Sequence, residues 1–225
     1  MSLIKDYLTS LNETEITCLI SSMDSKTFFT GDSEGVISQY STQERKLIKD
    51  YGKVHTRAIK VLYSNSLFDV LLSGDIKGDI VLINTRTEEV TKIYKKAHDF
   101  PITSIVITPR ADCFVSSDAG GNIKFWSFVK DIHRSDPSTV VFNDIQCESS
   151  YSDQNATGVY SLSLSLNGKY LFSTDYQGNC KCWLTKDRNV LWDYGKIHNN
   201  SFMCIEPGSP SKKVSRSKLE NQYTS

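Results

Sequence analysis

The sequence lacks the long apolar run that a membrane-spanning helix needs, since none of its hydrophobic stretches approaches about 18 residues. Its first six residues, Met1 to Asp6, carry charges where a secretory signal peptide has an apolar stretch. We therefore expect a cytoplasmic protein without a membrane span.

An excess of charge of either sign is also missing, because 26 Lys and Arg residues face 26 Asp and Glu residues. Proteins that bind nucleic acids or anionic membranes in bulk need a net basic surface. The neutral balance therefore argues against nucleic acid as a partner.

Motifs of catalytic sites are absent as well. No Gly-rich loop precedes a helix where it could cradle a phosphate, and there is neither a Gly-x-Ser-x-Gly elbow nor a pair of His residues on a helix. We find no amphipathic helix anywhere in the chain. These absences predict a protein that is not an enzyme and holds no cofactor.

The cysteines lack the Cys-x-x-Cys spacing and the clustered His residues of a zinc site. We therefore expect all six to be reduced, small core residues rather than metal ligands or disulfides. They are Cys18, Cys113, Cys147, Cys180, Cys182 and Cys204.

One ten-residue pattern, by contrast, occurs four times. It consists of Asp, two variable residues, Gly, and a short strand that ends on a large apolar side chain. The copies are residues 31–40, 74–83, 117–126 and 174–183. The steps between the turn glycines are 43, 43 and 57 residues, and a four-stranded propeller blade needs about 40–45.

Each copy has the composition of a β-hairpin. An apolar run precedes the Asp and a second run follows the Gly, while Asp can bond to its own following backbone and Gly tolerates a positive φ. These turns also explain the four Asp residues better than a ring of cation ligands would, so we expect no metal. The Asp residues are Asp32, Asp75, Asp118 and Asp175.

A third run precedes every hairpin and a fourth, more polar run follows it, which gives four strands per unit. The units span about 14–55, 56–98, 99–158 and 159–198. In the third unit we expect the outer strand at 139–142 and a polar surface loop at 148–154, because the period is stretched there.

Both ends of the chain suggest further blade material. Leu3–Tyr7 repeats Leu47–Tyr51 residue for residue, so residues 1–13 are interpreted as the outer strand of a missing or closing blade. Residues 199–205 begin a fifth unit, and the polar residues 206–225 are expected to be disordered.

These repeats resemble the WD-repeat (WD40) family of β-propellers over about residues 14–205. The resemblance rests on the period, on the strand-ending Trp126 and on a His that precedes the innermost strand, as at His55, His98 and His198. It implies a buried hydrogen-bond network in which His98, Ser116 and Trp126 form one set. The family's turn Asp usually stands directly before the Gly, whereas this chain has its Asp two residues earlier.

The fold class that follows is all-β: a WD40-type propeller of four complete four-stranded blades plus part of a fifth. An unclosed array would expose two large apolar faces, so we expect a truncated propeller, or one completed by another chain or by self-association. The alternative is a compact four-bladed ring that Leu3–Tyr7 closes.

For function, the resemblance implies a non-catalytic scaffold that presents propeller loops to partner proteins. The loops between blades and the turns inside blades share one face, on which we select Arg57, Ile76, Phe100 and Tyr176 as partner-binding residues. Equally, Phe100 and Tyr176 could simply pack over their neighbours. Two other functions stay open: a recruiting domain of a larger enzyme, and a phosphoinositide-binding propeller, although the basic motif expected of the latter is missing.

Overall fold

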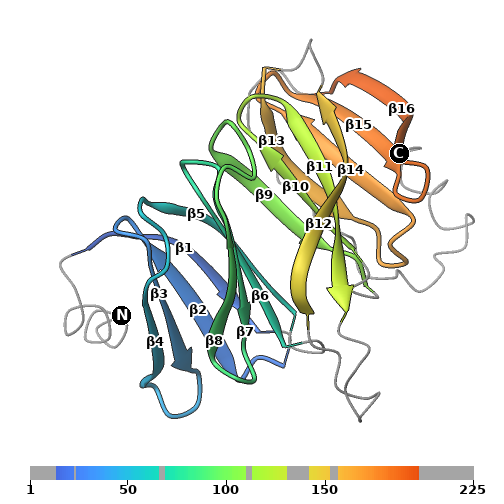
Figure 1. Ribbon diagram of the computed structural model, residues 1–225. Coiled ribbons are helices and arrows are strands. Elements are labelled where there is room, and N and C mark those ends of the chain that lie inside the picture. Colours follow the sequence, from blue (N-terminus) through green and yellow to red (C-terminus); the bar gives the residue numbers. More distant parts are fainter. Residues whose placement is uncertain are drawn as a thin grey trace, which may run out of the picture.

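The computed structural model describes residues 14–22, 24–65, 69–109, 113–130, 142–152 and 157–197. All regular elements in these residues are strands, and they form four antiparallel sheets of four strands each (Figure 1). The predicted all-β propeller architecture with four complete blades is thereby confirmed. The part-blade at 199–205, the Leu3–Tyr7 strand, His133, His198 and the C-terminal tail lie outside the described residues.

The strands of each sheet follow one another in chain order. Blade 1 contains β1 (Ile16–Ser21), β2 (Thr27–Asp32), β3 (Val36–Ser41) and β4 (Leu47–Lys53). Blade 2 contains β5 (Ile59–Asn65), β6 (Val70–Asp75), β7 (Ile80–Asn84) and β8 (Glu89–Tyr94). Blade 3 contains β9 (Ile102–Ile107), β10 (Cys113–Asp118), β11 (Asn122–Lys130) and β12 (Phe142–Ser152). Blade 4 contains β13 (Val159–Leu164), β14 (Tyr170–Asp175), β15 (Asn179–Leu184) and β16 (Asn189–Lys196).

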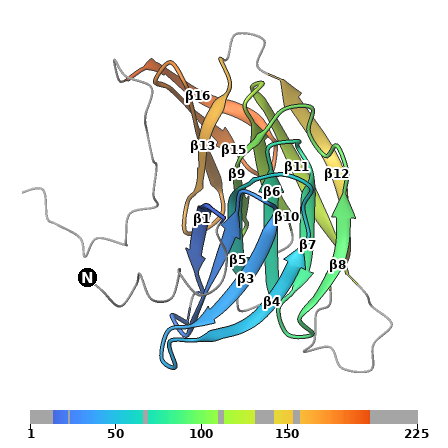
Figure 2. The ribbon, with the colours of Figure 1, turned by 90° about the vertical axis from the view of Figure 1, so that its left-hand side faces the viewer.

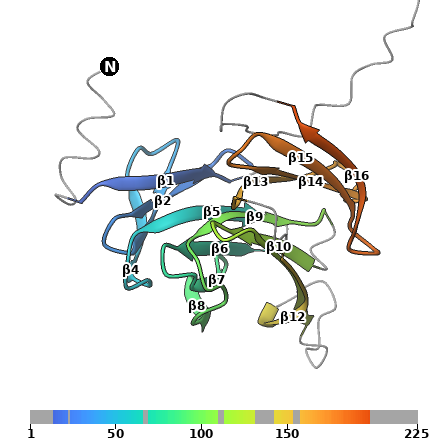
Figure 3. The same ribbon diagram turned by 90° about the horizontal axis from the view of Figure 1, so that it is seen from above.

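The four blades lie beside one another in chain order (Figures 1 and 2). The first strands of successive blades are neighbours, since β1 packs against β5, β5 against β9, and β9 against β13 (Figure 3). Three hydrophobic clusters fill the interfaces between blades 1 and 2, 2 and 3, and 3 and 4. Trp126 and Trp183 are buried in two of them, as the blade register predicted.

The outer strand of blade 3 differs from the prediction. β12 covers Phe142–Ser152 and pairs with β11 over the whole length of both strands. The interpretation of residues 148–154 as a surface loop was therefore wrong for most of that segment. An outer strand packs little of its surface against a neighbour and tolerates a polar sequence, so polarity alone did not distinguish strand from loop here.

The cysteines in the described residues are free thiols, but they are not uniformly buried. Cys180 and Cys182 are core residues, as expected. Cys147 is exposed on β12, so the prediction that it is a core residue was wrong. Cys18 is half-buried, and burial raises the pKa of its thiol to about 11. This thiol therefore stays protonated at neutral pH.

No helix that could cross a membrane occurs in the described part of the chain.

Candidate interaction face and its histidine network

The repeated Asp builds the same turn in every blade. One carboxylate oxygen accepts hydrogen bonds from the backbone nitrogens two and four residues later, at 2.8 to 2.9 Å, in all four copies. The following glycines have φ values of 82° to 93°, which a residue with a Cβ rarely adopts. This confirms the turn-forming role predicted for Asp32, Asp75, Asp118 and Asp175.

In blade 3 the second oxygen of the turn Asp belongs to a buried network. His98 Nδ1 lies 2.9 Å from Asp118 Oδ2, and His98 Nε2 lies 2.6 Å from Ser116 Oγ. Trp126 Nε1 donates to the same Ser116 oxygen at 2.7 Å. The set implied by the resemblance is thus assembled, and Asp118 joins it as the fourth member although it precedes the usual Asp position by two residues.

Blade 2 has a shorter version of this network. His55 Nε2 lies 2.8 Å from Ser73 Oγ, but the strand that would carry the Trp ends on Ile83, which has no donor. His55 Nδ1 lies 3.1 Å from Asp75 Oδ2, yet neither atom meets hydrogen-bond geometry. The two side chains are thus close, but less well aligned than His98 and Asp118 in blade 3.

In blades 1 and 4 other side chains of the described residues bond to the second oxygen of the turn Asp. In blade 1 Thr14 Oγ1 donates to Asp32 Oδ2 at 2.9 Å. In blade 4 Asn179 Nδ2 donates to Asp175 Oδ2 at 2.6 Å, and Trp183 Nε1 donates to Ser173 Oγ at 2.8 Å. The amide of Asn122 in blade 3 donates in the same way to Asp118 Oδ2, at 2.8 Å. The second oxygen of the turn Asp therefore has a side-chain contact in every blade, as expected of a structural role.

The network also sets the charge state of its carboxylates. Burial by itself would raise the pKa of Asp118, but hydrogen bonds from His98 and Asn122 outweigh it and hold the pKa below its usual range. The pKa of Asp75 is lowered in the same way, with burial opposed by His55 and by backbone donors. Both residues are therefore ionised at neutral pH and stabilise the turns as anions.

The turns and the loops between blades form one face of the molecule, which we call the turn face. In each blade the residue after the turn Asp donates its backbone N–H to a carbonyl just before the first strand: Ser33 to Glu15, Ile76 to Ala58, Ala119 to Pro101, and Tyr176 to Gly158. Turn glycines connect neighbouring blades, because a Cβ on Gly35 would meet the carbonyl oxygen of His55 and one on Gly78 that of His98.

All four residues selected from the sequence are exposed on the turn face. Phe100 is 49% exposed, and its ring lies directly over Gly120, where an added Cβ would come within 2.2 Å of it. Tyr176 is 37% exposed and makes an edge-on contact with Tyr160, at 5.3 Å between ring centroids. The two rings therefore both pack on neighbours and present a large apolar surface.

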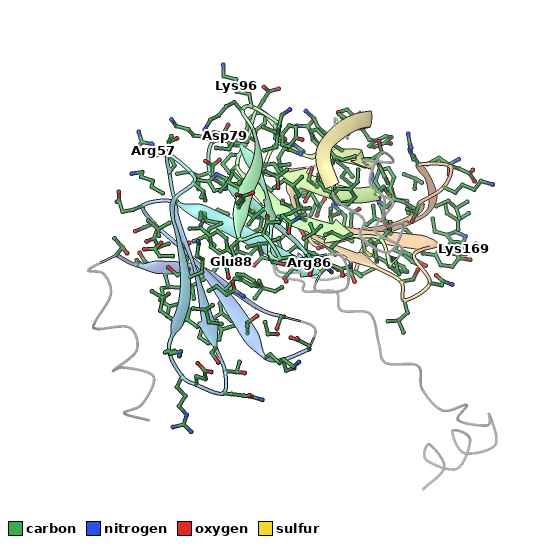
Figure 4. All side chains as sticks on the ribbon, turned by 60° about the horizontal axis from the view of Figure 1, so that its bottom comes forward. Arg57, Asp79, Arg86, Glu88, Lys96 and Lys169 are labelled. Carbon is green, nitrogen blue, oxygen red and sulfur yellow. The ribbon has the colours of Figure 1, made fainter. Side chains whose placement is uncertain are left out.

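Cations surround these apolar residues. Lys95 is paired with Asp79 at 2.9 Å, and Lys53 with Glu34 at 3.5 Å. The side chains of Arg57, Lys77 and Lys96 have no ion-pair partner among the described residues, and Glu15 and Asp99 are exposed carboxylates of the same loops. Figure 4 shows Arg57, Asp79 and Lys96 together, away from Arg86 and Lys169. The turn face thus combines apolar rings with paired charges and three cations that have no ion-pair partner among the described residues.

Sequence reasoning missed three contributors to this face: Tyr160, Lys77 and Lys96. Tyr160 precedes the turn by sixteen residues and reaches Tyr176 only in the folded blade, so no local signal could have indicated it. The two lysines stand beside turn residues that were selected, and a charge count along the turns would have found them. In the described residues no three His, Cys, Asp or Glu side chains lie close enough to hold a metal ion.

Comparison with known proteins agrees with this geometry. The family described as WD domain, G-beta repeat matches residues 89–127 and 145–183. The first match runs from β8 through β11 and the second from within β12 through most of β15, so each joins the outer strand of one blade to three strands of the next. No curated protein sequence matches the chain.

Solved structures with this fold are numerous, with 1550 matching chains, so the fold itself does not select a function. One is a chain of the "Crystal Structure of Mitotic Checkpoint Complex", with a TM-score of 0.68 and 13% sequence identity. The alignment covers 84% of this chain and 53% of that one, so this chain matches about half the length of its structural neighbour.

Proposed function

Because the chain contains WD repeats folded as propeller blades, we propose that it is a non-catalytic scaffold that binds partner proteins through its turn face. The observation that carries this proposal is the exposure of Ile76, Phe100 and Tyr176 on one face that backbone hydrogen bonds hold rigid. Exposed aromatic and Arg residues are the usual anchors of protein interfaces. A rigid frame allows loop residues to serve binding without disturbing the blades.

The charges on this face favour a partner segment with acidic residues. Arg57, Lys77 and Lys96 are exposed cations with no ion-pair partner among the described residues, whereas Glu34 and Asp79 are already paired with lysines and only Glu15 and Asp99 are further exposed carboxylates described on this face. Acidic groups on a partner would gain a favourable long-range attraction that accelerates association. Apolar side chains of the same partner would cover Phe100 and Ile76.

Site-specific photo-crosslinking tests the proposal. The full chain carries a photoreactive phenylalanine analogue in place of Phe100, and a control chain carries it in place of Ile93, which is similarly exposed on the outer strand β8. We expect protein adducts from position 100, reduced by Ile76→Ser with Tyr176→Ser, and none above background from position 93. Equal adducts at both positions would contradict binding through the turn face.

A further inference from the structure

The first strand of blade 1 leaves exposed a position that blades 2, 3 and 4 bury. Each of the four first strands starts with an apolar residue that is paired with the turn Asp of its own blade, and this pairing aligns the strands. Leu19 lies three residues after this start and is 61% exposed. The residues at the same position in the other blades are at most 6% exposed, because each packs in the interface with the preceding blade: Leu62, Ile105 and Leu162.

The second strand of blade 1 shows the same difference. Phe28 is only half-buried and stacks on Tyr40, with 5.0 Å between the ring centroids. Its counterparts are fully buried in the interfaces with the preceding blades: Leu71, Phe114 and Leu171. We call Ile16, Leu19 and Phe28 the outward face of blade 1.

Blade 4 is open on its opposite side. Phe172 is half-buried there, whereas its counterparts are buried in the interfaces with the following blades: Phe29, Leu72 and Val115. On the outer strand of blade 4, Trp192 and Tyr194 are 54% and 52% exposed. Tyr51 has the place of Tyr194 in the same Asp-Tyr-Gly-Lys sequence of blade 1, and it packs into the interface with blade 2. We call Phe172, Trp192 and Tyr194 the outward face of blade 4.

The turn before the outer strand adds a polar contact to the interfaces between blades. Arg45, Glu88 and Arg188 share one position in this turn, with φ values of 53° to 57°, three residues after a Thr whose N–H donates to the residue before the second strand. Glu88 Oε2 lies 3.5 Å from Lys49 Nζ of blade 1. The guanidinium of Arg188 lies 6.0 Å from the ring centroid of Phe125 in blade 3. In both cases the side chain at this position reaches the preceding blade.

Arg45 is exposed and has no ion-pair partner in the part of the chain that the structure describes. The outward face of blade 4 offers a matching group. Trp192 pairs with Cys182 as Lys49 pairs with Gln39, so the indole occupies the position of the lysine that Glu88 reaches. A guanidinium over the face of a Trp ring is a favourable cation–π contact.

From this complementarity we infer that the outward face of blade 4 binds the outward face of blade 1 of a second copy of this chain, with Arg45 of one copy over Trp192 of the other. The contact repeats the three interfaces inside the chain, in which the following side of one blade always meets the preceding side of the next. Two blade 1 faces, or two blade 4 faces, would make a pairing that none of these interfaces shows.

A contact between two different faces can be tested by mixing variants, because each copy contributes only one face to it. Leu19→Lys alters the face of blade 1 and Trp192→Lys that of blade 4, and both side chains are exposed, so both variants should fold. In sedimentation velocity over a concentration series, each variant alone should associate at least about tenfold more weakly than wild type, since the contact would bury a lysine.

An equimolar mixture of the two variants should form dimers again, because one copy still has an unaltered blade 4 and the other an unaltered blade 1. The mixture should contain nothing larger than dimers, since both remaining faces carry the added lysine. Arg45→Glu should weaken the association of an otherwise wild-type chain by about twofold to fivefold. The control Ile93→Lys alters an exposed residue of β8 and should change neither measurement.

A mixture that stays monomeric would overturn the inference, and so would either single variant that associates like wild type. A wild-type chain that is monomeric at every concentration would also overturn it and would assign the two faces to other segments of the same chain.

Discussion

Trp126 and Ser116 are both buried and are joined by a hydrogen bond of 2.7 Å from the indole nitrogen to the hydroxyl oxygen. The ring also stacks on Phe114, at 5.7 Å between centroids, within the cluster between blades 2 and 3. One side chain therefore links two strands of blade 3 and fills the contact with blade 2.

Replacing this ring should destabilise the fold severely. Trp126→Ala is expected to lower the free energy of unfolding by about 3–5 kcal/mol, because it leaves a cavity and removes the donor to Ser116. The control Trp192→Ala changes an indole that is 54% exposed and should have little effect. Urea denaturation of both variants checks this, and equal midpoints would contradict the assigned blade register.

Two serines of the network allow the loss of two hydrogen bonds to be compared with the loss of one. Ser116 accepts from Trp126 and contacts His98, whereas Ser73 in blade 2 has a side-chain contact with His55 alone among the described residues. Ser116→Ala should therefore cost about 2–4 kcal/mol, and Ser73→Ala about 1–2 kcal/mol, because the first leaves two buried groups without a partner. Both serines are fully buried, so burial does not explain the difference. Similar losses for the two variants would show that the Trp bond adds nothing.

Acid should weaken the same network. The folded-state pKa of Asp118 lies below its usual value of about 3.9. The stability that its carboxylate contributes is therefore fully present above pH 4 and is lost as pH falls through the folded pKa. Asp118→Asn removes this contribution, so wild type and variant should differ most in unfolding free energy above pH 4 and should converge toward pH 2.

Denaturation curves measured from pH 7 down to pH 2 give this comparison. Asp99→Asn is the control, because Asp99 is adjacent to the network residue His98 but exposed. At pH 7 this variant should unfold with a free energy close to that of wild type, unlike Asp118→Asn. A constant gap for Asp118→Asn across the whole range would exclude the carboxylate as the titrating group.

Two glycines with similar backbone geometry test the close approach of neighbouring blades. Gly78 and Gly52 have φ values of 82° and 68°, but an added Cβ meets the His98 carbonyl oxygen at 2.1 Å only in the first case. Gly52→Ala should cost about 1–2 kcal/mol from backbone strain alone. Gly78→Ala should lower the free energy of unfolding by clearly more, as thermal unfolding would measure. Equal losses for the two variants would mean that blade 2 relaxes away from blade 3.

Much of this fold could be predicted because its signals are local. The Asp-x-x-Gly turns and the apolar runs on either side of them specify the two middle strands of each blade within about fifteen to eighteen residues. The buried positions of His55 and His98 followed from their recurrence at one register, and the structure confirms them.

The features that sequence reasoning did not predict depend on tertiary contacts. β12 forms a strand because it pairs with the edge of β11, although the residues of its second half are polar. The place of Asp118 in the network depends on where strand β10 ends relative to His98.

The outward sides of blades 1 and 4 carry apolar residues that no described residue covers. Cys18 and Ile20 pack against blade 2, so Leu19 between them points away from it and is 61% exposed. In blade 4, Trp183 packs against blade 3, so its neighbour Cys182 and the residue paired with Cys182, Trp192, face the other way. Each inner blade buries both of its sides against neighbours.

These two outward faces should make the full chain self-associate and bind a hydrophobic dye. Leu19→Lys combined with Trp192→Lys should reduce both the dye fluorescence and the fraction of oligomer in sedimentation velocity, because a charge on each face opposes its burial. The control Ile93→Lys alters an exposed residue of the outer strand β8 and should change neither. A wild-type chain that sediments as a single monomer and leaves the dye dark would show that both faces are covered in solution, and the double variant would then have no effect on either measurement.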